Sequence, residues 1–231
     1  MIRAVFMDID NTLLDFDAAA QEGMAHCFED AGLIYKPEMF SVFKEENDRI
    51  WKKIEQGILT MDDLPYVRWQ AILKKLGLEA DGVAMEMLFR KCLFYSAVPM
   101  EGAKEILDHL QGKYILCTAS NGPYEQQICR LKKADMLKDF DHYFVSEKIG
   151  VDKPDVRFFE RCLEQLPGIR AEKCMIIGDS LTADIAGGQA AGMETCWFCR
   201  EKMEESELEN VRRTHKADHV IKRLEELKDL L

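Results

Sequence analysis

The stretch AVFMDIDNTLLDF, residues 4–16, combines the pattern of a buried strand with two closely spaced acids. Four apolar residues lead directly into Asp8 and Asp10, and Thr12 follows two residues later. Side chains two apart on an extended chain share one face, so we expect the two carboxylates to lie side by side. Like charges at the end of a buried strand are unfavourable without a counter-charge. The stretch therefore predicts a strand that ends in a polar site.

Short apolar runs recur along the rest of the chain and alternate with helical patterns. These runs lack the polar–apolar alternation of a half-exposed sheet, which is typical of parallel strands that are covered on both faces. We expect an α/β fold with a Rossmann-like parallel sheet core and helices on both faces. The predicted strands are residues 4–7, 114–118, 142–145, 174–177, 195–198 and 219–221.

Residues 17–96 contain no convincing strand pattern and hold several helical patterns instead. The segment is much longer than a crossover between adjacent parallel strands requires. We therefore expect two domains, a Rossmann-like core of residues 1–16 and 97–231 and an inserted helical-bundle cap of residues 17–96. Hinge motion is expected at the two tethers, near residues 15–17 and 96–99.

Composition limits the classes of function. The net charge of −11 over 231 residues argues against a surface that binds a nucleic acid polymer. No apolar run approaches the length of a membrane span and no signal peptide precedes the first strand, so we expect a cytoplasmic protein with reduced cysteines. Cys196 and Cys199 have the spacing of a redox pair, but their apolar context favours strand residues over a redox role. We interpret the charged run 201–213 as a solvated helix face.

Polar residues follow several of the predicted strands, at the edge where parallel strands end together. Carboxylates in this number repel one another unless a cation lies among them, and hard oxygen ligands favour Mg²⁺. A lysine and backbone amides beside such a cation make an anion pocket, for which a phosphoryl group is the natural guest. The residues concerned are Asp8, Asp10, Thr12, Ser120, Asn121, Lys153, Asp179 and Asp184.

These segments resemble the four motifs of the haloacid dehalogenase superfamily of aspartate-nucleophile hydrolases. DIDNTL resembles the first motif, SNG the second, DKPD the third with its lysine, and GDSLTAD the fourth. Four motifs in order, each at a strand end, are far more specific than a lone pair of aspartates. The resemblance covers the whole chain, and it implies that the Rossmann-like core is catalytic and that residues 17–96 are the family's C1 cap.

The resemblance also implies a role for each residue in phosphoryl transfer. Asp8 is expected to be the nucleophile that forms an aspartyl-phosphate, and Asp10 the general acid and then the general base. Mg²⁺ is expected to contact Asp8, Asp179 and the main-chain carbonyl of Asp10. Asp184 is expected to bind the metal directly or through water. The side chains expected to bind phosphoryl oxygens are those of Thr12, Ser120, Asn121 and Lys153.

The substrate is less constrained than the reaction. The stretches EQGILT…VRW and SNGPYEQQICRL are similar to a nucleotidase-like branch that dephosphorylates pyrimidine and other nucleoside monophosphates. We therefore expect a magnesium-dependent phosphomonoesterase that acts on a nucleoside 5'-monophosphate or a similar small phosphorylated metabolite. Asn47, Trp51 and Arg68 of the cap are the candidates for contacts with the leaving group. A monomer and a homodimer both agree with the sequence.

Other functions stay open at this stage. They are a sugar-phosphate mutase, a phosphoglycolate-type phosphatase, a 2-haloacid dehalogenase and a catalytically inactive interaction module. The GDS of the fourth motif resembles hydrolases more than mutases. Asp10 argues against a dehalogenase, because that chemistry needs neither magnesium nor an acid two residues after the nucleophile. The intact set of polar residues argues against an inactive module.

Overall fold

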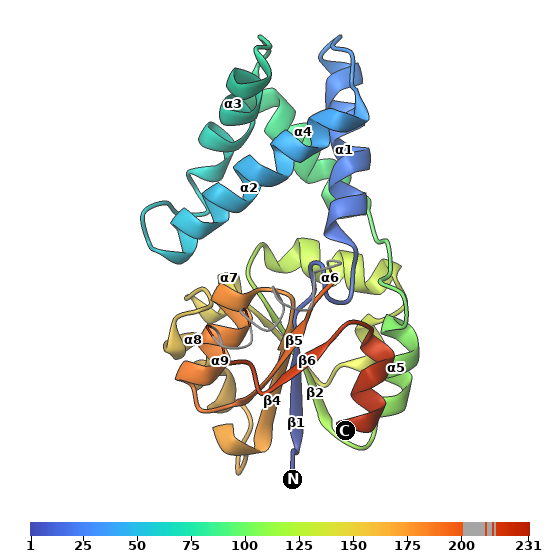
Figure 1. Ribbon diagram of the computed structural model, residues 1–231, viewed down its shortest axis with the longest axis vertical. Helices are drawn as coiled ribbons and strands as arrows, with labels where there is room; N and C mark the ends of the chain where they lie inside the picture. Colours follow the sequence, from blue (N-terminus) through green and yellow to red (C-terminus); the bar gives the residue numbers. More distant parts are fainter. Residues whose placement is uncertain (201–210, 212–213, 215) are drawn as a thin grey trace. The chain divides into compact units, whose positions relative to one another are not determined.

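A computed structural model describes residues 1–200, 211, 214 and 216–231 of the chain. The charged run interpreted as a solvated helix face falls largely on residues outside this description. The chain divides into two compact units, which are considered one at a time (Figure 1). The first comprises Met1–Asp15 and Val98–Leu231, and the second comprises Phe16–Ala97. No helix in the described residues has the length and apolar character that a membrane span requires.

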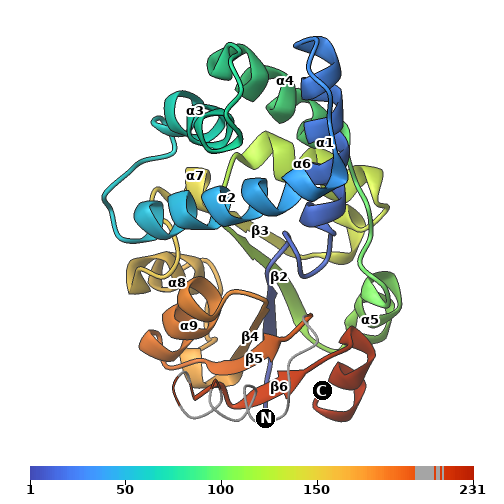
Figure 2. The ribbon, with the colours of Figure 1, turned by 45° about the horizontal axis from the view of Figure 1, so that its top comes forward.

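The first unit contains a six-stranded parallel sheet, which confirms the α/β fold expected from the sequence. The strands are ordered β3-β2-β1-β4-β5-β6, so the chain runs outward from β1 in one direction and from β4 in the other (Figure 2). In an open sheet, ligands bind beyond the carboxyl ends of the strands at such a switch point. The strands are Ala4–Met7, Ile115–Ser120, His142–Val145, Cys174–Gly178, Glu194–Phe198 and His219–Ile221. Each predicted strand forms, with its ends shifted by at most two residues.

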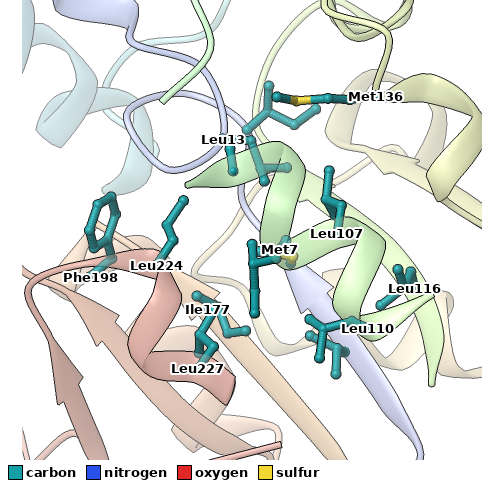
Figure 3. Packing of buried hydrophobic residues seen from close by; sticks show 14 of the residues in the cluster. Met7, Leu13, Leu107, Leu110, Leu116, Met136, Ile177, Phe198, Leu224 and Leu227 are labelled. Carbon is teal, nitrogen blue, oxygen red and sulfur yellow. The ribbon is translucent and has the colours of Figure 1, made fainter. Parts of the chain in front are cut away.

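Every residue of β1 is buried, because helices cover both faces of the sheet. Val5 and Met7 of β1 contact a cluster that includes Leu107 of α5 and Leu224 and Leu227 of the C-terminal 3₁₀ helix (Figure 3). The alternate β1 side chains face a second cluster, which contains residues of α8. Figure 1 accordingly shows α5 on one side of the sheet and α8 and α9 on the other. The helical elements of this unit are α5 Ala103–Leu110, α6 Tyr124–Lys133, η2 Leu137–Asp139, α7 Ser146–Ile149, α8 Val156–Leu163, η3 Ala171–Lys173, η4 Leu181–Ile185, α9 Ala186–Ala190 and η5 Leu224–Asp229.

The cysteine pair lies within the sheet and its immediate continuation. Cys196 belongs to β5 and Cys199 follows that strand, and both are buried and form no disulfide within the described residues. Burial raises the pKa of Cys196 to about 12, which keeps the thiol protonated and unreactive. The interpretation of these residues as apolar strand residues agrees with this environment.

Residues 16–97 form the second unit, and they contain helices and no strand. Trp69 lies at the centre of its core, with its ring centroid 6.0 Å from that of Phe43 and 5.5 Å from that of Phe89. This aromatic core explains why the segment is a compact unit rather than a loop. Its helices are α1 Phe16–Asp30, η1 Pro37–Met39, α2 Phe40–Glu55, α3 Leu64–Leu76 and α4 Gly82–Tyr95.

A buried ion pair joins two helices of this unit. Arg68 of α3 donates from Nε and Nη2 to the two carboxylate oxygens of Glu86 of α4, at 2.9 and 2.6 Å. Its Nη1 donates to Asn47 Oδ1 at 3.2 Å, and its guanidinium lies 4.8 Å from the centre of the Phe89 ring. The geometry therefore supports a structural role for Arg68 and Asn47. Contact of either with a leaving group remains a prediction.

Loss of the carboxylate of this pair is expected to cost more stability than loss of the whole pair. Glu86→Leu leaves the buried guanidinium without its counter-charge, which should lower the free energy of unfolding by about 3–5 kcal/mol. The double variant Arg68→Met/Glu86→Leu removes both buried charges. Arg90 Nε, which also donates to Glu86 Oε1 at 2.8 Å, belongs to a side chain that is 38% exposed and can be solvated, so most of that loss should be recovered. Urea unfolding followed by circular dichroism measures both values.

Glu45→Leu is a matched control, because Glu45 forms an exposed pair with Lys75 in the same unit. It should change the free energy of unfolding by no more than about 0.5 kcal/mol. A double variant less stable than Glu86→Leu would contradict the assignment of a charge-compensated pair.

Candidate active site

Asp8 follows β1 directly, at the switch point of the sheet. Its backbone N–H donates to the carbonyl oxygen of Ile177 at 2.9 Å, so β4 fixes the backbone at this position. The side chain is only 10% exposed. The end of β1 thus places a carboxylate in a buried environment, where an unpaired charge is unfavourable.

Lys153 supplies the positive charge beside Asp8. Its ammonium nitrogen donates to Asp8 Oδ1 at 2.8 Å, to Asp184 Oδ1 at 2.5 Å, and to the carbonyl oxygen of Ala119. The ammonium has three hydrogens, and each has an acceptor. Because Lys153 and Asp184 are almost completely buried, these contacts hold both side chains in one orientation.

Asn121 holds the backbone of Lys153 in place. Its Oδ1 accepts from the N–H of Lys153 at 2.8 Å, and its Nδ2 donates to the carbonyl oxygen of Lys153 at 2.9 Å. The sequence predicted that Asn121 binds phosphate. The geometry supports an indirect contribution, in which its amide fixes the position of the lysine, and a direct contact with phosphate remains a prediction.

Three carboxylates of the site are close enough to share one cation. Oxygen atoms of Asp8, Asp179 and Asp184 all lie within 4.8 Å of one another. With all three ionised, the one ammonium of Lys153 leaves two negative charges uncompensated within the group. Hard oxygen donors and this charge suit a divalent cation such as Mg²⁺. The residues present therefore fit a metal site.

Gly178 allows Asp184 to enter this group. A Cβ atom at position 178 would lie 2.1 Å from Asp184 Oδ2, so no other residue fits without displacing the carboxylate. The same oxygen accepts from the N–H of Ser180 at 3.0 Å. Both oxygens of Asp184 therefore have protein partners, which favours a role that orients metal ligands over direct coordination.

Burial of the acids changes their protonation. Desolvation raises the pKa of Asp8 to about 7, aided by Asp184 and Asp10 and opposed by Lys153. Desolvation, together with Asp8 and Asp184, also raises the pKa of Asp179 well above its ordinary value. Burial alone would lower the pKa of Lys153, but Asp184 and Asp8 outweigh it and raise that pKa. The lysine is thus charged at neutral pH. Its single positive charge does not balance the negative charge that the three buried carboxylates would carry when ionised.

Asp10 points to a different set of partners. Its Oδ1 accepts from Arg130 Nη1 at 2.5 Å and its Oδ2 from Gln127 Nε2 at 2.7 Å, both from α6. The Asp10 side chain is therefore not part of the group formed by Asp8, Asp179 and Asp184. The sequence predicted a metal contact only for the main-chain carbonyl of Asp10, and that contact remains a prediction. The sequence analysis missed Gln127 and Arg130. The available signal was two polar residues three apart on one helix, a spacing that places them on a common face.

The two predicted hydroxyl ligands of the phosphoryl group lie in these same segments. Ser120 ends β2, is buried, and accepts from Gln127 Nε2 at 2.9 Å. Thr12 is completely buried, and among the described residues its Oγ1 has no hydrogen-bond partner. Thr12 can therefore donate to a further acceptor. The Ser120 hydroxyl donates to the carbonyl oxygen of Asn121 at 3.4 Å, a long contact that it can exchange for another acceptor.

A parallel sheet with buried acids and a lysine gathered at its switch point defines the site of an enzyme. The sequence matches the family of haloacid dehalogenase-like hydrolases over residues 2–192. The HAD-hydrolase YfnB of Bacillus subtilis is 37% identical over 196 residues, which cover 85% of this chain and 83% of YfnB. The chain therefore belongs to the haloacid dehalogenase-like hydrolase family.

Other relatives extend this comparison. The pyrimidine 5'-nucleotidase PynA of Streptococcus pneumoniae is 32% identical over 197 residues, covering 85% of this chain and 83% of PynA. The pyrimidine 5'-nucleotidase YjjG of Escherichia coli is 28% identical over 203 residues, covering 88% of each. A crystal structure of YfnB bound to magnesium has a TM-score of 0.89 at 34% identity, with 100% of this chain and 98% of YfnB covered. The fold and the family are thus shared over nearly the full length.

The buried charge of Asp8 predicts a pH-dependent effect of its removal. The pKa of Asp8 rises from 3.8 to about 7, so its contribution to stability is fully present below about pH 4 and is lost as the pH rises through 7. In metal-free protein, Asp8→Asn should therefore have a Tm above that of the wild type at pH 8. The difference should shrink towards pH 4.

Thermal unfolding in the presence of a chelator, at a series of pH values, measures this difference. The exposed acid Asp229 provides the control, since Asp229→Asn should leave the pH dependence unchanged. An Asp8→Asn protein that is less stable than the wild type at pH 8 would show that the carboxylate is not under electrostatic strain.

Proposed function

We propose that this protein is a magnesium-dependent phosphomonoester hydrolase that acts through an aspartyl-phosphate on Asp8. The observation that carries the proposal is the buried Asp8 carboxylate, bonded to Lys153 and grouped with Asp179 and Asp184. Phosphoryl transfer needs a positioned nucleophile and positive charge around the transferring oxygens. Both are present in this group of residues.

Each residue has a place in the reaction. Asp8 attacks phosphorus and forms the P–O bond of the intermediate, while Asp10 gives a proton to the departing alcohol oxygen. Asp10 then takes a proton from the water that attacks the intermediate and releases Asp8. Lys153, Ser120 and Thr12 stabilise the phosphoryl oxygens.

The metal would be held by Asp8 and Asp179, with Asp184 orienting its ligands. When bound, Mg²⁺ supplies positive charge that offsets the charge of the phosphoryl group. The main-chain carbonyl of Asp10 is proposed as a further ligand, as the sequence predicts. The relative YfnB has a structure bound to magnesium, which supports this choice of ion.

We propose a nucleoside 5'-monophosphate as the substrate class, with another small phosphorylated metabolite as the alternative. The relatives PynA and YjjG are pyrimidine 5'-nucleotidases, which supports the first. Asp10, held by hydrogen bonds, favours the hydrolase over a dehalogenase, which has no leaving alcohol to protonate. We propose that the enzyme acts in the cytoplasm on a soluble substrate.

The helical unit Phe16–Ala97 is proposed as the cap that selects the leaving group. Its attachment points at residues 15–17 and 96–99 are the proposed hinges, and the interdomain movement described for YfnB supports them. Among the three candidate contacts, Trp51 is only partly buried, whereas the polar groups of Asn47 and Arg68 bond to each other. Trp51 is therefore the strongest candidate for contact with a substrate.

Removal of the metal or of either catalytic carboxylate is expected to stop turnover. Chelator treatment should abolish phosphate release, and added Mg²⁺ should restore it. Asp8→Asn should be inactive because an amide cannot attack phosphorus, and Asp10→Asn should lose about 10²–10⁴-fold in rate. Phosphate release from a panel of nucleotides, sugar phosphates and phosphoglycolate measures these effects. Full activity in chelator would refute the metal requirement, and normal turnover by either variant would refute its assigned role.

Substitution in the cap is expected to change the preference among substrates. Trp51→Ala should alter the ranking of kcat/KM across nucleotides and sugar phosphates and leave 4-nitrophenyl phosphate within about 3-fold of the wild type, because that ester needs little from a cap. Tyr66→Ala, which removes an exposed aromatic of the same unit, is the control. An equal loss on every substrate, the aryl ester included, would argue against a selective cap.

A further inference from the structure

We infer that Arg130 and Gln127 of α6 are positioning residues that orient Asp10 for proton transfer. The inference rests on the proposed function and concerns residues that none of the four motif roles includes. Arg130 is completely buried, whereas the Asp10 side chain that it contacts is 30% exposed. A buried charge thus holds a carboxylate that substrate and water can still reach.

The two contacts fix the orientation of the Asp10 carboxylate plane. Arg130 Nη1 binds Asp10 Oδ1 at 2.5 Å, and Gln127 Nε2 binds Oδ2 at 2.7 Å. A single contact would allow the carboxyl group to rotate about it, but one donor on each oxygen removes that freedom. Asp10 lies in the loop after β1, so strand hydrogen bonds do not impose this orientation. The orientation comes from α6.

Arg130 also decides which way Gln127 points. The amide oxygen of Gln127 accepts from Arg130 Nη1 at 2.9 Å, so its NH₂ group faces Asp10 and Ser120. The second hydrogen of that NH₂ donates to Ser120 Oγ at 2.9 Å. The serine oxygen accepts this bond, while its own hydrogen donates to the carbonyl oxygen of Asn121 at 3.4 Å, a long contact that it can exchange for one to a phosphoryl oxygen. One amide therefore aligns the proton-transfer residue with a phosphate-binding hydroxyl.

The aligned step is balanced in atoms and charge. As Asp8 forms its bond to phosphorus, the bond from phosphorus to the alcohol oxygen breaks and the carboxyl proton of Asp10 moves to that oxygen. Asp10 is left as a carboxylate, which Arg130 and Gln127 hold until it accepts a proton from the attacking water. Arg130 and Gln127 act through Asp10. The loss of rate on substituting either one must therefore be larger for a leaving group that needs a proton more.

Leaving-group dependence therefore tests the inference. 4-Nitrophenolate departs without much help, whereas the alkoxide of benzyl alcohol needs a proton. Arg130→Met should lower kcat/KM for benzyl phosphate by about 10²-fold or more and that for 4-nitrophenyl phosphate by less than about 3-fold. The use of kcat/KM restricts the comparison to steps up to formation of the aspartyl-phosphate. Arg130→Lys should recover part of the loss, since it keeps the charge but not the planar geometry.

A double-mutant cycle tests whether Arg130 acts through Asp10. In an Asp10→Asn background, Arg130→Met should cause little further loss on benzyl phosphate, because the residue that it orients is already disabled. Arg170→Met is the control, since Arg170 forms an exposed pair with Glu172, and it should change neither ester. Circular dichroism and Tm confirm that each variant is folded.

The outcomes separate the inference from the proposed function. Equal losses on the two esters, or a full additional loss in the Asp10→Asn background, would overturn the inference while the hydrolase assignment stands. A wild-type protein that with Mg²⁺ releases phosphate neither from these esters nor from any nucleotide, sugar phosphate or phosphoglycolate would instead overturn the proposed function and the inference with it. If Arg130→Met does not fold, Gln127→Met carries the same test, and a selective loss on benzyl phosphate is again the expected result.

Discussion

The site depends on a single buried ammonium group. Lys153 binds two carboxylates and one carbonyl oxygen in a place that water hardly reaches. Without it, Asp8 and Asp184 would be like charges in a medium of low polarity, and burial would force them to take up protons. Even with it, the pKa of Asp8 is raised to about 7. The protein thus stabilises its acids only in part, and the remaining charge is what a divalent cation would balance.

Several features of the fold serve this arrangement. Strands β1 and β4 are neighbours in the sheet and end at the same edge, which places Asp8 beside Asp179. Gly178 leaves the space that Asp184 occupies, and Asn121 clamps the backbone of Lys153 from the neighbouring strand end. These residues come from segments far apart in the sequence, and the parallel sheet is the element that brings them together.

The sequence alone predicted the sheet well, because buried parallel strands leave short apolar runs that turns and helices interrupt. Asp8 and Asp179 could be placed for the same reason, since each follows one of these runs directly, whereas Lys153 was placed by the resemblance of its DKPD segment to a family motif. The pairing of Asp10 with Arg130 could not be predicted. Helical spacing identifies a face of α6, but the partner of that face depends on how the helix lies over the sheet.

Arg68 illustrates the converse limit. An arginine in a cap suggests a contact with substrate. The guanidinium of Arg68, however, is bonded to the carboxylate of Glu86, 18 residues further along the chain. Sequence gives the charge of a residue and not its partner, so a structural ion pair and a binding residue look alike at that level. Composition was more informative for Cys196, whose apolar neighbours indicated a strand.

The central claim is that Asp8 carries the phosphoryl group during turnover. The most direct measurement is to quench the enzyme during turnover of 4-nitrophenyl phosphate, reduce it with borohydride, and map the peptides by mass spectrometry. Borohydride converts an acyl phosphate to an alcohol, so the account predicts homoserine at position 8 that appears only with substrate and Mg²⁺. Unmodified Asp8 in an enzyme that is demonstrably turning over, or homoserine at another aspartate, would contradict it.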